Sequence, residues 1–196
     1  MKKFKNILLA TTLTISAFLV PTNISAASSY TVQNGDSLWK ISNTFGIPIT
    51  SIKESNNQSG NMIYIGQRLT IPTTVSTSDK QLLAQLVEAE AKGEPYAGKV
   101  AVATVVLNRV DHSEFPNTVK GVIYQKVSGY YAFTPVQNGA INNTPTASSI
   151  RAVNEALAFR GQGQGSIYFY NPKTSTSDWI NSRQTTVTIG NHRFAK

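Results

Sequence analysis

One acidic residue, Glu90, shares a helical face with hydrophobic side chains near the middle of the chain. Three apolar residues and this acid are spaced at i, i+3, i+4 and i+7: Leu83, Leu86, Val87 and Glu90. Burial of a carboxyl group disfavours its charged form and raises its pKa, which makes Glu90 a candidate general acid near neutral pH. The same pattern fits a structural acid that an arginine or backbone amides hold in place. The periodicity leaves both interpretations open.

Few other residues offer catalytic chemistry. The chain has no cysteine, which excludes thiol catalysis and disulfides, and two histidines, His112 and His192. A zinc amidase would need both histidines and a carboxylate, because a zinc site typically has three protein ligands. The two histidines are far apart in the sequence, so we expect no metal and no other cofactor. Two neighbouring acids, Glu88 and Glu94, fall elsewhere on the helical wheel and are predicted to be solvated.

The elements that must position Glu90 are mostly helices. Its own helix, for which Ser78 is the predicted N-cap, is followed by an apolar helix over 98–110 and an amphipathic helix over 145–160. Arg109, near the end of the apolar helix, is a candidate partner for an acid or a simple cap. Two strands close the chain, over 167–170 and 185–189. This order predicts an α+β domain with a helical lobe and a small β lobe.

The first 26 residues have the pattern of a secretory signal peptide. Lysines at positions 2, 3 and 5 precede the apolar stretch Ile7–Val20, and small residues suited to cleavage follow. The stretch is short for a membrane anchor and no second one could cross a bilayer, so we expect no membrane contact after cleavage. Removal of the signal peptide's three lysines lowers the formal net charge from +8 to +5, and a basic secreted protein suits an anionic cell-wall polymer. The basic residues are scattered and no nucleic-acid motif is present, so we expect no nucleic-acid partner.

The mature chain divides into two modules. A polar stretch over 73–78 is the predicted linker between a small module, 29–72, and a larger one, 79–196. In the small module, alternating residues at each end and two capped apolar segments between them predict the order β-α-α-β.

The small module resembles a LysM domain over its full length, in YTVQNGDSLWKISNTFGI, SNN and IYIGQRLTIP. LysM domains bind glycans that contain N-acetylglucosamine, chiefly peptidoglycan or chitin. The resemblance implies a groove between the loop after the first strand and the loop before the second, lined by Gly35, Asp36, Ser37, Leu38, Met62, Ile63 and Tyr64. Trp39 is expected in the core, because it lies on the apolar stripe of its helix.

The larger module resembles the SleB/CwlJ family of spore cortex-lytic cell-wall hydrolases, in EAKGEPYAGKVAVATVVLNRV, GVIYQ, AFTPVQNG, YFYNP and IGNHRF. The family's Gly-Glu-Ala-Arg-Gly-Glu run corresponds to residues 89–94, which places its catalytic acid at Glu90. The resemblance implies a fold similar to lysozymes and lytic transglycosylases, and attack on the MurNAc–GlcNAc β-1,4 bond. Ala89 and Lys92 depart from the family's Gly and Arg, so cortex and vegetative wall both remain open as substrates.

The reaction follows from the number of available acids. A lytic transglycosylase works with one acid, whereas a hydrolase usually needs a second carboxylate about 5–9.5 Å away. No other acid of the module lies in an obviously apolar setting, so we favour the single-acid mechanism with Glu90. The candidate cleft residues are Phe133, Thr134, Tyr168, Asn171 and His192.

The expected partners are peptidoglycan glycan strands. We expect a secreted monomer in the cell wall or spore envelope of a Gram-positive bacterium, with a possible part in cortex lysis during germination. One alternative is a non-catalytic wall-binding protein, in which Glu90 faces a sealed core. Another is an N-acetylmuramoyl-L-alanine amidase.

Overall fold

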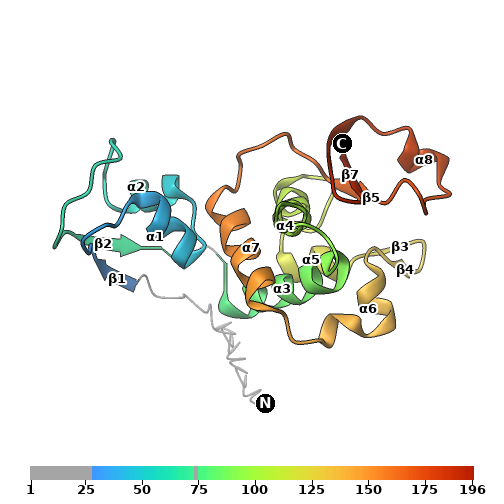
Figure 1. Cartoon of the computed structure of the whole chain (residues 1–196), viewed down its shortest axis with the longest axis horizontal. Coiled ribbons are helices and arrows are strands. Elements are labelled where there is room, and N and C mark those ends of the chain that lie inside the picture. Colours follow the sequence, from blue (N-terminus) through green and yellow to red (C-terminus); the bar gives the residue numbers. More distant parts are fainter. Residues whose placement is uncertain (1–27, 73–74) are drawn as a thin grey trace, which may run out of the picture.

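A computed structural model describes residues 28–72 and 75–196 of the chain. The predicted signal peptide, 1–26, lies outside these residues. Two regions are visible in Figure 1: a small one built from the N-terminal elements, and a larger helical one that carries the C-terminal strands.

The small region consists of two short helices and a two-stranded sheet. Strands β1 (Ser28–Thr31) and β2 (Arg68–Ile71) pair antiparallel, with helices α1 (Leu38–Phe45) and α2 (Ile49–Ser55) between them in sequence. The Ser37 side chain accepts a hydrogen bond from the Lys40 amide and caps α1, as is usual for serine before a helix. The helix ends at Gly46, which has the left-handed φ of +59° that glycine adopts without strain. The predicted β-α-α-β order is confirmed.

The exposure of Trp39 contradicts one prediction in this region. The buried side of α1 is formed by Leu38, Ile41 and Ser42, whereas Trp39 remains 47% exposed. A helix of only eight residues packs on the small core with one narrow face, and Trp39 lies about 100° round the helix from its neighbour Leu38. The expectation that Trp39 belongs to the core was therefore wrong.

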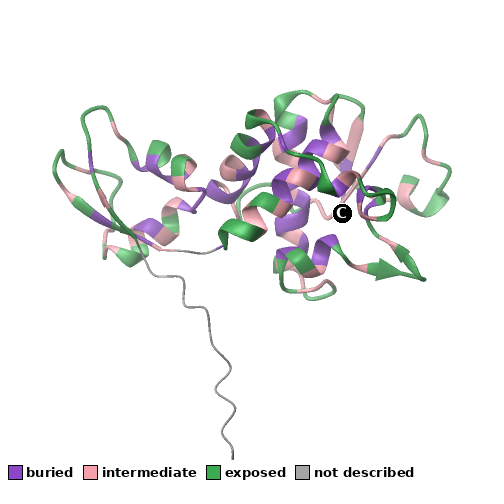
Figure 2. Cartoon of the chain, turned by 90° about the horizontal axis from the view of Figure 1, so that it is seen from below, coloured by how far each residue is buried: buried purple, intermediate pink, exposed green. Residues whose placement is uncertain are grey.

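Three helices form the core of the larger region: α3 (Thr77–Ala91), α4 (Tyr96–Asp111) and α7 (Ala147–Ala158). Their facing side chains are small or branched and fully buried, among them Leu86, Val102 and Leu157. Figure 2 shows the buried residues gathered where these helices meet, while the outlying loops are exposed. Burial of side chains of this size stabilises the fold by about 1.5–3 kcal/mol each.

The first helix of this region begins earlier than its predicted cap. Ser76, not Ser78, accepts the hydrogen bond from the Asp79 amide, at 3.1 Å, and α3 begins at Thr77. Val75 is already buried against the larger core. The predicted linker, 73–78, is thus shorter, because its second half belongs to the helix and its core.

The remaining elements are short. They comprise α5 (Val119–Ile123), the hairpin β3 (Lys126–Val127) and β4 (Tyr130–Tyr131), α6 (Thr134–Asn138), a 3-10 turn (Ala140–Asn142), β5 (Tyr168–Tyr170), α8 (Asp178–Asn181), β6 (Thr185–Ile189) and β7 (His192–Ala195). The last three strands form an antiparallel sheet in the order β5-β7-β6, so the C-terminal strand is central. The predicted α+β class, with a helical lobe and a small β lobe, is confirmed.

The two regions contact each other through α1 and α7, which lie side by side (Figure 1). Gly46 is so close to α7 that an added Cβ would lie 2.7 Å from the Asn154 side-chain oxygen. The Lys80 ammonium donates to the Phe45 carbonyl across the same junction. Burial lowers the pKa of Lys80, as expected for an ammonium group withdrawn from water.

Candidate active site

Glu90 lies in the last turn of α3 and is partly buried. Burial raises the pKa of its carboxyl to about 7, against a weaker opposing effect of the Arg109 guanidinium, which favours the carboxylate. A carboxyl group with this pKa exists in both protonation states at neutral pH. It can therefore donate a proton and take one back within a catalytic cycle.

Arg109, on α4, is the cation whose charge acts on the Glu90 carboxyl. Its Nε donates a hydrogen bond of 2.7 Å to the Ile167 carbonyl just before β5. Its guanidinium carbon lies 5.1 Å from the ring centroids of Phe115 and Phe133 and 5.7 Å from that of Tyr168. Burial lowers the pKa of Arg109 to about 10, so it stays charged at neutral pH. We define these three rings as the aromatic cage of Arg109.

A pocket of about 540 Å³ opens beside this cage. It is lined by Arg109, Glu114, Phe115, Gln125, Val127, Ala132, Tyr168, Phe169, Ser177, Trp179 and Ile180. Glu90 does not line the pocket itself and is linked to it through Arg109, which lines the pocket and interacts with the Glu90 carboxyl. The lining combines aromatic surface with hydrogen-bonding groups, as pockets for small polar ligands do.

The structure gives the five predicted cleft residues different surroundings. Tyr168 lines the pocket and belongs to the cage. Phe133 is 2% exposed and packs on Arg109 from beneath the surface. Thr134 is exposed at the first position of α6. Asn171 follows β5, and its side chain accepts a hydrogen bond of 2.9 Å from the Lys173 amide, which stabilises a turn.

His192, the fifth predicted residue, lies on β7 and packs against Phe169, which lines the pocket. Its ring centroid is 5.3 Å from that of Phe169. Its Nδ1 is buried with no hydrogen-bond partner among the described residues. Of the five, only Tyr168 is a lining residue of the pocket.

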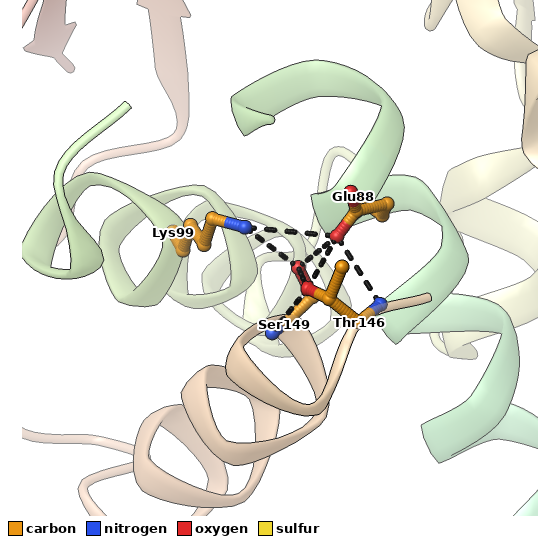
Figure 3. A network of polar contacts seen from close by, with 4 residues as sticks. All are labelled: Glu88, Lys99, Thr146 and Ser149. Atoms are coloured by element: carbon orange, nitrogen blue, oxygen red, sulfur yellow. Dashed lines mark hydrogen bonds and ion pairs between the residues drawn. The ribbon is translucent and has the colours of Figure 1, made fainter. Parts of the chain in front are cut away.

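Glu88 corrects the prediction that it is solvated. It is 7% exposed and lies in a network with Lys99, Thr146 and Ser149 that joins α3 to α4 and α7 (Figure 3). Ser149 Oγ and Thr146 Oγ1 donate to Glu88 Oε2 at 2.6 and 2.7 Å, and Lys99 Nζ lies 3.6 Å from the same oxygen. The hydrogen bonds from Ser149 and Thr146, more than the Lys99 charge, lower the pKa of Glu88 to about 2.

Glu94 is likewise less solvated than predicted. Its side chain is partly buried and accepts hydrogen bonds from the backbone and side chain of Asn191, at 2.9 and 3.1 Å. These bonds hold the β6–β7 turn against the start of α4. An added Cβ at Gly190 would lie 1.9 Å from Glu94 Oε2, so this turn requires glycine.

The predicted glycan-binding residues of the small region include both exposed and structural groups. Met62 and Tyr64 are 70% and 67% exposed and line a pocket of about 450 Å³ with the loop before β2. In contrast, Leu38 is buried in the core, and Asp36 accepts hydrogen bonds from the Tyr30 hydroxyl and the Gln33 amide. Gly35, Ser37 and Ile63 are the remaining predicted positions. Ile63 packs against the small core.

Two general features of the described residues concern metal ligands and membrane spans. No group of three or more His, Asp or Glu side chains among residues 28–72 and 75–196 is placed to hold a metal ion. Within the same residues, no helix is both long and apolar enough to span a bilayer.

Trp179 and Phe115 line the pocket but are not among the residues predicted from the sequence. Trp179 follows Ser177 and Asp178 in a polar stretch, and Phe115 lies in a turn. Neither has a periodic pattern around it. The only available signal was their type, a large aromatic residue in a short polar segment.

Comparison with known proteins identifies both regions. Residues 30–72 match the LysM domain and residues 93–195 match the Cell Wall Hydrolase family, a match that begins three residues after Glu90. The spore cortex-lytic enzyme of Halalkalibacterium halodurans is 46% identical over 124 residues, which are 63% of this chain and 36% of that protein. The chain thus spans about a third of the length of this relative.

Two solved structures share the fold of the larger region. The catalytic domain of the Bacillus cereus SleB protein is 44% identical, with a TM-score of 0.58 over 64% of this chain and 94% of that domain. The catalytic domain of the germination-specific lytic transglycosylase SleB from Bacillus anthracis is 43% identical, with a TM-score of 0.58 over 64% of this chain and all of that domain. Both resemblances drawn from the motifs are confirmed, and the chain belongs to the Cell Wall Hydrolase family, with a LysM domain ahead of the family domain.

Proposed function

We propose that this protein cleaves the MurNAc–GlcNAc bond of peptidoglycan as a lytic transglycosylase, with Glu90 as its acid and base. The observation that carries the proposal is the Glu90 carboxyl, whose pKa burial raises to about 7 and on which the charge of Arg109, a residue of the pocket lining, acts. Its relatives named spore cortex-lytic enzyme and germination-specific lytic transglycosylase support the same chemistry.

The reaction needs one proton-transferring group. Protonated Glu90 donates its proton to the glycosidic oxygen, and the bond between this oxygen and C1 of the muramic residue breaks. The resulting Glu90 carboxylate takes the proton of the C6 hydroxyl, whose oxygen bonds to C1 and closes a 1,6-anhydro ring. The proton is returned to Glu90, so no water and no second acid is consumed.

A hydrolytic mechanism would require a second carboxylate or a positioned water. Glu88 is poorly suited, because it is ionised and bound by two hydroxyl groups on the opposite side of α3. Glu114 is the carboxylate that lines the pocket among the described residues. It is therefore the residue whose removal distinguishes the two mechanisms.

We further propose that the LysM domain holds the enzyme on peptidoglycan. One such module binds weakly, and attachment to the catalytic region raises the effective concentration of substrate at the site. Secretion by the N-terminal signal peptide would deliver the protein to the cell wall or spore envelope, and cortex lysis during germination is one setting consistent with its relatives. We expect it to act as a monomer.

Mass spectrometry of muropeptides released from purified peptidoglycan tests the proposal. The mature protein, Glu90→Gln and Glu114→Gln are each incubated with vegetative and cortex material. We expect 1,6-anhydro products from the wild type and from Glu114→Gln, and none from Glu90→Gln. Products with reducing ends that vanish in Glu114→Gln would instead establish a two-carboxylate hydrolase. Binding to both materials without release would favour a wall-binding protein, and cleavage at the lactyl amide would favour an amidase.

A further inference from the structure

Trp179 is a large aromatic side chain that lines the pocket and yet remains 52% exposed. It belongs to the four-residue helix α8, between β5 and β6. The Ser182 hydroxyl donates to the Trp179 carbonyl at 2.8 Å, which fixes the backbone of this turn. The exposed part of the indole therefore has no packing role within the β lobe.

The indole ring is nevertheless held in one orientation. The Arg183 guanidinium carbon lies 4.1 Å from its ring centroid, a cation–π contact that covers part of the ring. The Tyr168 ring meets it edge-on, with centroids 5.2 Å apart and planes at 82°. Because these contacts fix the ring before any ligand arrives, a ligand that stacks on it pays little for ordering the side chain.

Trp179 is also connected to the candidate acid. Tyr168 contacts Trp179 on one side and belongs to the aromatic cage of Arg109 on the other. Arg109 in turn interacts with Glu90. The exposed ring thus lines the same pocket as Arg109, whose charge acts on the proposed proton donor.

We propose that Trp179 is a stacking platform for one pyranose ring of the glycan strand. This inference rests on the proposed function and names how its substrate is held. The apolar face of a pyranose carries C–H groups that pack on an indole, while its hydroxyl and acetamido groups need hydrogen-bonding partners. Gln125, Ser177 and Glu114 line the same pocket and can supply them.

The tryptophan content of the chain permits a direct binding test. The chain has two tryptophans, Trp39 and Trp179, so Trp39→Phe leaves Trp179 as the single indole. In a Trp39→Phe, Glu90→Gln protein, titration with the soluble tetrasaccharide (GlcNAc-MurNAc)₂ should change the fluorescence of Trp179 in a saturable manner. Because the LysM domain can bind the same tetrasaccharide, calorimetry alone does not report on the pocket. Unchanged Trp179 fluorescence at tetrasaccharide concentrations that saturate cleavage by the Trp39→Phe protein would overturn the platform.

Kinetics on the same tetrasaccharide provide the second test. In the otherwise wild-type protein, Trp179→Ala should raise KM about ten-fold with a smaller change in kcat. Trp179→Phe should recover most of this loss, because a phenyl ring keeps an aromatic face on which the sugar can stack. Tyr124→Ala removes an aromatic ring that is 39% exposed but does not line the pocket, and it should leave KM unchanged.

The proposed function and the Trp179 platform can be disproved independently. A wild-type protein that releases no product from peptidoglycan overturns the proposed function. A wild-type protein that cleaves, with a Trp179→Ala variant whose KM is unchanged, overturns only the platform. Circular dichroism of each variant establishes that a raised KM does not come from unfolding.

Discussion

The two sides of helix α3 carry the same chemical group in opposite states. Glu88 and Glu90 are two residues apart, which separates them by about 200° around the helix. On one side, hydroxyl groups from α7 donate to Glu88 and lower its pKa to about 2. On the other, burial raises the pKa of Glu90 to about 7 with no hydrogen bond to offset it among the described residues.

The difference between the two acids shows that burial does not decide the role of a carboxylate. Glu88 is the more buried by exposed area, and its ionised form is the stable one because hydrogen bonds to the charged form replace water. Glu90 has the charge of Arg109 nearby but no hydrogen bond to its carboxylate among the described residues, so burial favours its neutral form. We infer that Glu88 contributes to stability and Glu90 to chemistry.

The largest expected effect is on turnover. Glu90→Gln should lower kcat for peptidoglycan by about 10²–10⁴-fold, the usual contribution of a general acid. Glu88→Gln, assayed at a temperature where it is folded, should retain kcat within a few-fold, because Glu88 faces away from the pocket. Muropeptide release measured for both variants checks this, and equal losses would contradict the division of roles.

The second effect is on the free energy of unfolding, which Glu90→Gln and Glu88→Gln should change in opposite directions. A Glu90 pKa above its ordinary value means that the folded state binds a proton that the unfolded state has released, so Glu90 lowers stability as pH rises from about 4.5 to 7. Glu90→Gln should therefore stabilise the protein at pH 8, by up to about 3 kcal/mol, and change little at pH 4.

Glu88 should behave in the reverse way. Its lowered pKa contributes stability that is present above about pH 4.5 and lost as pH falls toward 2. Glu88→Gln should cost about 3 kcal/mol at pH 8. Urea unfolding of both variants at pH 8 measures the two effects side by side. Destabilisation by Glu90→Gln at that pH would show that Glu90 is a structural acid.

A smaller effect concerns the pH dependence of activity. Because Glu90 must be protonated to donate, kcat/KM should fall as pH rises through about 7. Arg109 favours the charged form of Glu90, so Arg109→Met should raise the pKa of Glu90 and move this descending limb of the pH–rate profile to higher pH. Arg109→Lys, which keeps the charge, should leave the limb nearly in place. A limb that moves equally in both variants would mean that Arg109 acts through packing alone.

Much of this arrangement could be predicted from local sequence. The β-α-α-β order, the α+β class and the position of Glu90 on an apolar helical face follow from periodicity and from turn and cap residues, which act within a few positions. The bounds of α3 were displaced because Ser76 and Ser78 are equally good caps by type.

The state of Glu88 could not be predicted, because its partners are distant in sequence. Thr146 and Ser149 lie 58 and 61 residues away, and only the packing of α7 on α3 brings them to the carboxylate. The aromatic cage of Arg109 is similar, since its rings come from three separate segments. A helical wheel shows which side of a helix is apolar, but not what the other side meets.

The smallest predicted effects lie within the Glu88 network and rank its members. Ser149→Ala should raise the pKa of Glu88 most, Thr146→Ala less and Lys99→Met least, because the two hydroxyl groups donate short hydrogen bonds whereas the ammonium lies 3.6 Å away. Titration of the Glu88 side-chain carboxyl by ¹³C NMR measures this order without depending on the cap that Thr146 also provides for α7. If Lys99→Met gave the largest rise, the ion pair and not the hydroxyl groups would keep Glu88 ionised. The difference between the pKa values of Glu88 and Glu90 would then come from how close a cation lies to each carboxyl.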